Sequence, residues 1–205
     1  MSMERGSFAA RHDFDALPLS PDVDVRCAQS GEIAALSEMA HRLVPGVQIG
    51  ATELAKYVAF DPQSILTFTR NGNLLGGMAF LFLNDRGHDA LLLDDICLTA
   101  PETRHLASAN EDVSAIYIWA IAASGRGIAG LGKAAAHLRQ IRFRGADCYA
   151  QPSTVAGREI MKATGFSPIS SFQPDLWCYA RPWHRQPMLM PGAIIQARSF
   201  SDARH

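Results

Sequence analysis

The stretch IYIWAIAASGRGIAGLG, residues 116–132, decides the fold, because it joins the most strand-prone segment of the chain to closely spaced glycines. Residues 116–123 are apolar and rich in Ile, Tyr and Trp, which favour strands. The apolar positions that follow with helical spacing are Leu131, Ala135, Leu138 and Ile141. The sequence therefore predicts a central strand, a glycine loop and a helix in direct succession.

A strand that runs through a glycine loop into a helix is typical of phosphate-binding sites. The first N–H groups of a helix have no partner within it, and the helix dipole places partial positive charge there. Glycines let the backbone approach phosphate oxygens, because no Cβ stands in the way. Arg126 adds a formal charge. We therefore expect the loop to hold a pyrophosphate group.

One ligand class that fits this loop is a dinucleotide. GRGIAG, residues 125–130, matches the fingerprint G-x-G-x-x-G, which also requires an acidic residue about 20 positions further on, at the end of the next strand. Asp147 has roughly this spacing but lies at the start of the predicted strand, and Gln151-Pro152 follows the strand. The NAD or FAD alternative therefore remains open, but only the glycine loop supports it.

A second segment, QPSTVAGREIMKATGF at residues 151–166, places a polar residue after a strand and a helix before Gly-Phe. With this segment, the chain resembles the GNAT superfamily of acyl-CoA-dependent N-acyltransferases over residues 23–181. The resemblance implies an α/β (α+β) fold with a strongly bent mixed sheet of about seven strands flanked by helices. It also implies acetyl-CoA, or another acyl-CoA, as the cosubstrate.

The family's loop pattern, Q/R-x-x-G-x-G/A, can be aligned to this chain in two registers. In one register, Gly127 and Ala129 fill the last two positions and Ser124 replaces the Gln or Arg. In the other, Gly130 and Gly132 fill them and Gly127 takes the Gln/Arg place. Both registers remain open. The resemblance implies CoA binding by Ile121, Ala122, Ala123, Arg126, Gly127, Ile128, Ala129, Gly130, Gly132, Lys133 and Gln151.

The resemblance also implies that a backbone N–H on the central strand, around residues 120–122, polarises the thioester carbonyl, which is oxyanion-type stabilisation. Trp119 and Tyr117 share one face of this strand. We predict that they belong to the core, with the alternative that they line the acyl or acceptor pocket.

One departure from the family concerns the general acid. The family often has Tyr four residues before the Gly of Gly-Phe, where this chain has Met161. A thiol with a pKa of about 8.5 can leave as thiolate, so loss of the acid slows the reaction without forbidding it. Ser153, Tyr149 or a water could substitute, and reduced or absent activity is the alternative.

The general base has several candidates, because the central strand itself carries no carboxylate. Alkyl amines titrate at about 10.4, so a base or a water relay is expected. Asp95 and Glu111 are the candidates that we carry forward as catalytic residues, together with Ser153. The alternatives are Asp94, His105 and Asp112, and a role in a turn or in solvent is the competing explanation for each.

The sequence favours an N-acetyltransferase that transfers an acetyl or other acyl group from CoA to the amine of a small molecule or peptide. The first alternative is a GNAT-like domain that binds CoA with weak or no catalysis. The second is a dinucleotide-binding protein that uses GRGIAG.

Composition excludes several other classes. With 19 Lys+Arg against 20 Asp+Glu, the chain has no basic excess for binding nucleic acid. The four cysteines form no C-x-x-C pair, so we expect no metal site and no disulfide framework. No apolar run approaches the roughly 20 residues of a membrane helix, so we expect no membrane partner and a cytoplasmic protein.

The organisation of the chain is expected to be an N-terminal arm at residues 1–22, the acyltransferase domain at 23–181 and a C-terminal arm at 182–205. Residues 64–83 predict a β-hairpin, because Asn-Gly supplies the positive φ angles of a tight turn. ALLLDDICL, residues 90–98, predicts a further strand. The C-terminal arm could pack on a second subunit in a homodimer through Met188, Leu189, Met190, Ile194 and Ile195.

Overall fold

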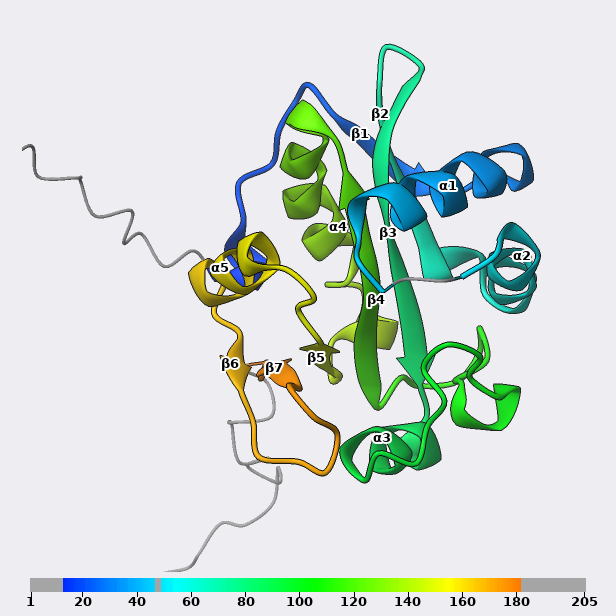
Figure 1. Ribbon diagram of the computed structural model, residues 1–205, viewed down its shortest axis with the longest axis vertical. Helices are drawn as coiled ribbons and strands as arrows, with labels where there is room; N and C mark the ends of the chain where they lie inside the picture. Colours follow the sequence, from blue (N-terminus) through cyan, green and yellow to red (C-terminus); the bar gives the residue numbers. More distant parts are fainter. Residues whose placement is uncertain (1–12, 47–48, 182–205) are drawn as a thin grey trace, which may run out of the picture.

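The computed structural model of the protein describes residues 13–46 and 49–181, which form one mixed sheet with helices on both of its faces (Figure 1). The order of the seven described strands is β1-β2-β3-β4-β5-β7-β6. The strands are β1 (Asp24–Cys27), β2 (Ile65–Arg70), β3 (Asn73–Leu83), β4 (Ala115–Ala123), β5 (Asp147–Ala150), β6 (Ser167–Pro168) and β7 (Trp177–Tyr179). The α-helices are α1 (Ile33–Leu43), α2 (Ala51–Phe60), α3 (Asp85–Leu92), α4 (Leu131–His137) and α5 (Val155–Ala163).

The first four strands form an antiparallel meander. The predicted hairpin is confirmed as β2 and β3, joined by a turn in which Asn71 and Gly72 have φ angles of 50° and 78°. The strand predicted from residues 116–123 is confirmed as β4, which pairs with β3 along its length. This pairing places β4 in the centre of the sheet.

The direction of pairing changes at β4. β5 runs parallel to β4, whereas β7 pairs antiparallel with both β5 and β6. The helix α4 supplies the crossover between β4 and β5, as a parallel connection requires. The sheet is therefore mixed, as expected, with its one parallel pair among the described strands in the middle.

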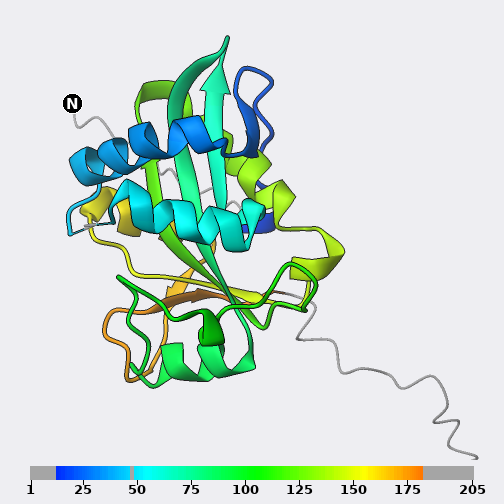
Figure 2. The same ribbon diagram turned by 90° about the vertical axis from the view of Figure 1, so that its right-hand side faces the viewer.

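The two faces of the sheet carry different helices. One face packs against α4 and α5 through a large apolar cluster that includes Phe68, Phe80, Ile116 and Leu138. The other face is covered by α1 and α2, which lie side by side in Figure 2, and by α3 beneath them.

The N-terminal segment is a correction to the expected arm at residues 1–22. Residues 14–16 form a short 3-10 helix, and Phe14 is 3% exposed. Its ring packs edge-on against Phe166 and Tyr179. Phe14, together with Asp13 bonded by Tyr179 and Asp15 near Arg181, thus anchors this segment to the domain. Residues 1–12 lie outside the described part of the chain.

Two predicted elements differ from the structure. Residues 85–92 form the helix α3, so the strand predicted at residues 90–98 is wrong. The side chain of Asn84 caps this helix by accepting a hydrogen bond from the N–H of Gly87. This cap favours a helix more strongly than the apolar residues that follow favour a strand. The helix after the glycine loop ends at His137, and Ile141 is 88% exposed rather than on its buried face.

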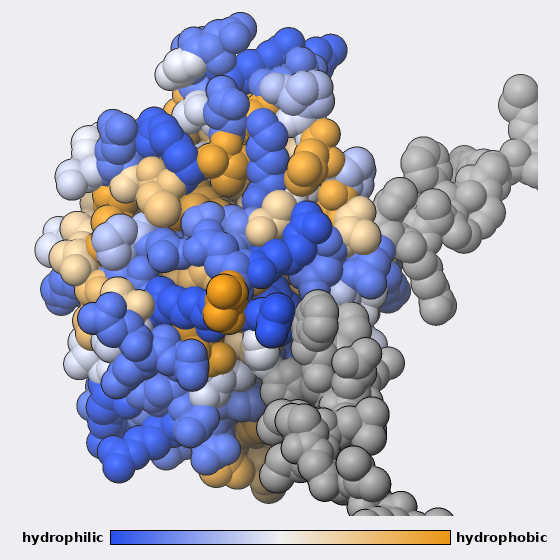
Figure 3. Space-filling model, turned by 180° about the vertical axis from the view of Figure 1, so that it is seen from behind, coloured by the Kyte–Doolittle hydropathy of each residue, from blue (hydrophilic) through white to orange (hydrophobic). Residues whose placement is uncertain are grey.

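Among the described residues, no helix is both long and apolar enough to cross a lipid bilayer. Seen from behind relative to Figure 1, the surface is largely hydrophilic with apolar residues interspersed (Figure 3). The predicted subunit contact through the C-terminal arm falls at residues 182–205, outside the described residues.

Candidate functional site

The central feature of the site is a split in the middle of the sheet. β4 pairs with β5 only from Ala115 to Ile118, although β4 continues to Ala123. β5 ends at Ala150, and Pro152, which has no N–H to donate, follows soon after. In Figure 1 the chain leaves β5 and turns toward α5. Residues 119–123 of β4 therefore lie beside an open edge.

A bulge and the strand register determine what this edge offers. The pairing with β3 shifts between Ala120 and Ile118, so Trp119 is the extra residue. The N–H of Ser124 bonds to the carbonyl oxygen of Leu75 on β3, 2.9 Å away. Antiparallel pairs alternate between bonded and non-bonded, so the backbone groups of Ile121 and Ala123 face away from β3, into the split. Two N–H donors thus line the open edge.

The glycine loop directly follows this edge and forms a 3-10 helix from Gly125 to Gly130 that runs into α4. A Cβ on Gly127 would lie 2.8 Å from the carbonyl oxygen of Leu75, and one on Gly130 would lie 2.7 Å from the ring of Phe68. These two glycines are therefore required for packing against β3 and β2. The sequence had suggested only that glycines let the backbone approach a phosphate. Gly125, in contrast, has a φ of +52° and open space around it.

Two basic side chains accompany the loop. Arg126 is exposed, and Lys133 on α4 lies 3.7 Å from the carboxylate of Asp24. The first N–H groups of the 3-10 helix have no partners within that helix. The loop therefore offers backbone donors and positive charge together, which suits a pyrophosphate.

Two side-chain hydrogen bonds lie where β4 and β5 part. The Tyr117 hydroxyl donates to the side-chain carbonyl of Gln151 at 2.8 Å, and the Gln151 amide donates to the carbonyl of Pro174 at 2.6 Å. Burial raises the pKa of Tyr117. Gln151, predicted as a CoA-binding residue, therefore also ties the end of β5 to the loop between β6 and β7.

The face opposite the glycine loop brings Trp119, which the sequence pointed to, together with Tyr57 and Glu53, which it did not. The rings of Tyr57 on α2 and Trp119 on β4 meet edge to face with centroids 5.1 Å apart. The Tyr57 hydroxyl lies 3.1 Å from the carboxylate of Glu53, and hydrogen bonds from Lys56 and Tyr57 lower the pKa of Glu53. Glu53 and Tyr57 are four residues apart on α2, but nothing in the sequence linked that segment to β4.

The three predicted catalytic residues lie on three separate segments. Asp95 is exposed in the turn after α3, and Ser153 is exposed between β5 and α5. The carboxylate of Glu111 accepts from the N–H of Ser108 at 2.7 Å, and the Glu111 carbonyl accepts from Arg142. The structure does not bring the three together, and it gives Glu111 the role of a loop-closing acceptor.

Two of the positions considered for the general acid, Met161 and Tyr149, are buried. Met161 on α5 is 9% exposed and belongs to the apolar cluster beneath α4 and α5. The hydroxyl of Tyr149 lies 2.8 Å from Nε2 of His88, and burial raises the pKa of Tyr149. Tyr149 points to the face covered by α3, whereas the glycine loop packs against the α4 face. Tyr149 is therefore poorly placed to protonate a group held by that loop.

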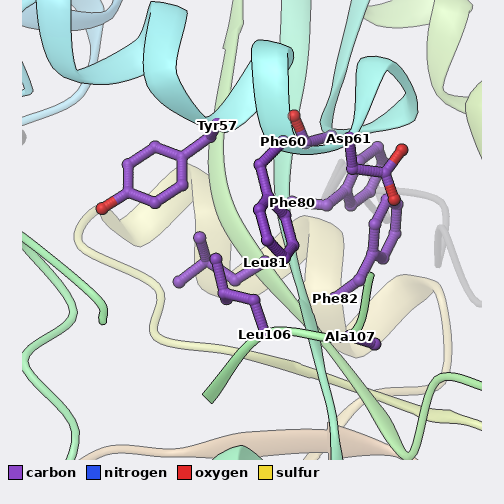
Figure 4. Close-up of a pocket in the computed structure, with 9 residues that line it drawn as sticks. Tyr57, Phe60, Asp61, Phe80, Leu81, Phe82, Leu106 and Ala107 are labelled. Carbon is purple, nitrogen blue, oxygen red and sulfur yellow. The ribbon is translucent and has the colours of Figure 1, made fainter. Parts of the chain in front are cut away.

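A buried ion pair ties the end of α2 to the chain after α4. Asp61 is 3% exposed and contacts Arg142 at 2.5 Å, while the guanidinium of Arg142 lies over the rings of Phe82 and Phe143. Beside it is a cavity of about 10 Å³, the size of one water, shown in Figure 4. The hydroxyl of Ser64, which also lines it, has no hydrogen-bond partner. The features of this cavity suit structural water rather than a substrate.

Within the described part of the chain, no three His, Cys, Asp or Glu side chains come together as a metal site would require. The four cysteines are free thiols, and burial raises the pKa of Cys148 to about 12.

Comparison with known proteins finds similarity at the level of structure. No protein-family model matches the sequence, and no curated protein does. The loading GNATL domain of CurA from Lyngbya majuscula is similar, with a TM-score of 0.54 over 77% of this chain and 97% of that domain, at 13% identity.

Two further similar structures are GNAT-type proteins with lower scores. Ard1 from Thermoplasma volcanium has a TM-score of 0.49 and 13% identity, over 77% of this chain and 95% of that one. A GNAT family acetyltransferase from Brucella melitensis, solved with acetyl-CoA, has a TM-score of 0.44 and 17% identity, over 77% and 87%. The similarity to the CurA domain shows that this chain has the GNAT fold.

Proposed function

We propose that this chain, with its GNAT fold, transfers an acyl group from acyl-CoA to the amine of a small molecule or peptide. The observation that carries the proposal is the open edge of β4 at residues 119–123, which leads directly into the glycine loop. The pantetheine arm of CoA contains amide groups, so it can pair with an open strand edge as an added strand does. The pyrophosphate then reaches the loop at the end of the same strand.

The residues of the loop support CoA binding as a unit. In this proposal, the free N–H groups at Gly125 and Arg126 and the charges of Arg126 and Lys133 bind the pyrophosphate. The N–H groups of Ile121 and Ala123 bind the pantetheine arm or the thioester carbonyl. A donor that is already fixed in a sheet needs no reorganisation when negative charge develops on the carbonyl oxygen.

The reaction is a direct attack. The amine nitrogen forms a bond to the thioester carbon, the carbon–sulfur bond breaks, and the sulfur leaves with the electron pair as thiolate. The attacking amine loses one proton, either to water or to a side chain on its own face of the sheet. Glu53, hydrogen-bonded to Tyr57, is a carboxylate on that face. Because its pKa is lowered by Lys56 and Tyr57, we favour a water held by Glu53 as the proton acceptor over Asp95 and Glu111.

Binding of acyl-CoA without efficient turnover is a second candidate function, and Met161 is the observation that favours it. A methionine in the apolar cluster has no proton to donate to a leaving thiolate. A dinucleotide is less well supported. Asp147, the predicted ribose ligand, accepts from the backbone N–H of Arg181 at 2.7 Å at the start of β5, and the sheet is mainly antiparallel rather than doubly wound.

Thermal unfolding with added ligands tests the proposal. Acetyl-CoA at about 100 times its Kd should stabilise the protein by about 2.7 kcal/mol, whereas NAD⁺ at the same concentration should not. Free thiol released from acetyl-CoA in the presence of an amine panel then measures transfer. Stabilisation by NAD⁺ without any by acetyl-CoA would overturn the proposal, and binding without amine-dependent thiol release would favour the second candidate.

A further inference from the structure

A second cavity lies between the helices α1 and α2 and the sheet, in the region that Figure 2 shows behind these two helices. Its volume is about 30 Å³. One water needs about 10 to 15 Å³ of such volume, and a methyl group needs slightly more. The cavity therefore has space for about two methyl-sized groups. The residues that line it are Leu36, Ala40, Ile49, Leu54, Ile65, Gly77, Met78, Ala79, Ala120 and Ala122.

The lining chemistry restricts what can occupy this cavity. Every lining side chain is apolar, so a water there would find few hydrogen-bond partners. Unfilled space among buried apolar residues also costs stability. An apolar group of a ligand would gain burial in this space.

The cavity adjoins the open edge of β4. Along this strand, the backbone groups of Ile121 face the split, and the side chains of Ala120 and Ala122 on either side of it line the cavity. Ile121 therefore lies between two residues of β4 that border the cavity. Ala120 and Ala122 present only methyl groups to the cavity, so no large side chain of β4 fills it at this point.

The position of the cavity relative to the two faces of the sheet indicates which reactant it could hold, CoA or the acceptor amine. The glycine loop packs on the α4 face, where Gly130 meets the ring of Phe68 and where the side chain of Ile121 also points. CoA bound at that loop therefore occupies the α4 face of the split. The nucleophile must approach the thioester carbonyl from the other side, which is the face of α1, α2 and the cavity.

We propose, resting on the proposed acyltransferase function, that this cavity receives the apolar part of the acceptor. The acceptor is then an amine that carries a short linear or branched alkyl group of about two to four carbons, rather than a polyamine or an amino sugar. Each CH₂ that enters the cavity should raise kcat/KM about fourfold, until the cavity is full.

The experiment measures acetyl-CoA-dependent thiol release with methylamine, ethylamine, n-propylamine, n-butylamine and isobutylamine. The variant Ala40→Leu fills the cavity from α1, and Ala35→Leu on the exposed side of the same helix is the matched control. We expect kcat/KM to rise about 15-fold over two carbons in the parent and in Ala35→Leu. In Ala40→Leu this dependence on chain length should disappear, with an unchanged Kd for acetyl-CoA and a raised Tm.

Three results separate this inference from the proposed function. Transfer that is indifferent to the alkyl chain and to Ala40→Leu overturns the inference and leaves the function standing. If kcat/KM instead rises with acyl chain length, from acetyl-CoA to propionyl-CoA and butyryl-CoA, the acyl group occupies the cavity. This result also overturns the inference. If no amine is acylated, the proposed transfer itself fails.

In that last case, the cavity is tested directly by ¹³C-methyl NMR with n-butylamine added to the CoA-bound protein. Shifts at the methyl groups of Leu36, Leu54 and Ile65 that vanish in Ala40→Leu support the inference. Absence of such shifts in the parent protein overturns it.

Discussion

The two halves of β4 have the same kind of sequence and different surroundings. Ala115 to Ile118 have β3 on one side and β5 on the other, and all four are buried. Trp119 to Ala123 have β3 alone, and four of these five are partly exposed. Both halves are apolar and strand-forming. Whether such a segment becomes core or ligand-binding edge therefore depends on its neighbour, and the neighbour ends where Pro152 follows β5.

The largest expected effect concerns the closed half. Ile116 is fully buried, so Ile116→Asp would place an unpaired carboxylate in the apolar cluster and should lower the free energy of unfolding by about 4 kcal/mol or more. Urea unfolding measures the loss. Ile141→Asp, at a position that is 88% exposed, is the control and should stay within about 0.5 kcal/mol of the parent. A similar response of the two variants would contradict the assignment of the closed half to the core.

A pair of proline substitutions compares the two sides of the open half. Ala122→Pro removes an N–H that the register directs to β3 and should cost about 3 kcal/mol of stability. Ile121→Pro removes an N–H that faces the split, so it should cost less stability but weaken acetyl-CoA binding about tenfold. Urea unfolding and calorimetric titration read the two quantities separately. Parent-like affinity in Ile121→Pro would remove Ile121 from the binding edge.

A smaller effect is expected at the end of the open half. Arg126→Ala removes an exposed charge next to the glycine loop and should raise the Kd for acetyl-CoA about threefold to tenfold at low salt. The difference should shrink as salt increases, because exposed charges are screened. Arg104→Ala, at an exposed ion pair with Glu102, is the control. An effect on affinity that is independent of salt would argue against a direct contact with the pyrophosphate.

The smallest effect is on the pH dependence of stability and concerns His137 on α4. This helix packs on the apolar cluster to which both halves of β4 contribute. Burial lowers the pKa of His137 from 6.5, although Asp61 opposes this shift. The unfolded chain thus binds the proton at higher pH, and the contribution of His137 to stability is full above pH 6.5 and is lost as the pH falls below it. His137→Gln should flatten the decline in urea midpoint on acidification, whereas His41→Gln on the exposed face of α1 should not. If the urea midpoint of His137→Gln declines with falling pH as steeply as that of the parent, other groups control this pH dependence.

Local signals predicted much of the fold correctly. The Asn71-Gly72 turn, the apolar run of β4 and the helix that ends before Gly165 each depend on neighbours in sequence, so they were found in place. α3 was missed, because the apolar residues 90–93 suit a buried strand as well as a short helix. The glycine loop was located correctly, but its glycines at positions 127 and 130 turned out to face β3 and β2.

The candidate site was predicted in part. The strand and loop that we propose bind CoA are contiguous in sequence, so spacing could place them, although it left two loop registers open. The opposite face combines Tyr57 from α2 with Trp119 from β4. The two rings are 62 positions apart in the sequence, and no periodicity relates them. Asp95, Glu111 and Ser153 were chosen for chemistry without knowledge of their positions.

The sequence by itself determined that a central strand leads through a glycine loop into a helix, because strand propensity, glycine spacing and helical periodicity act over short stretches. Only the tertiary structure decided which side of that strand is open, which face carries the loop and which face holds the apolar cavity. These properties depend on where β5 ends relative to β4 and on how α1 and α2 pack across the sheet. Long-range packing is what turns an apolar strand into a place where two reactants can meet.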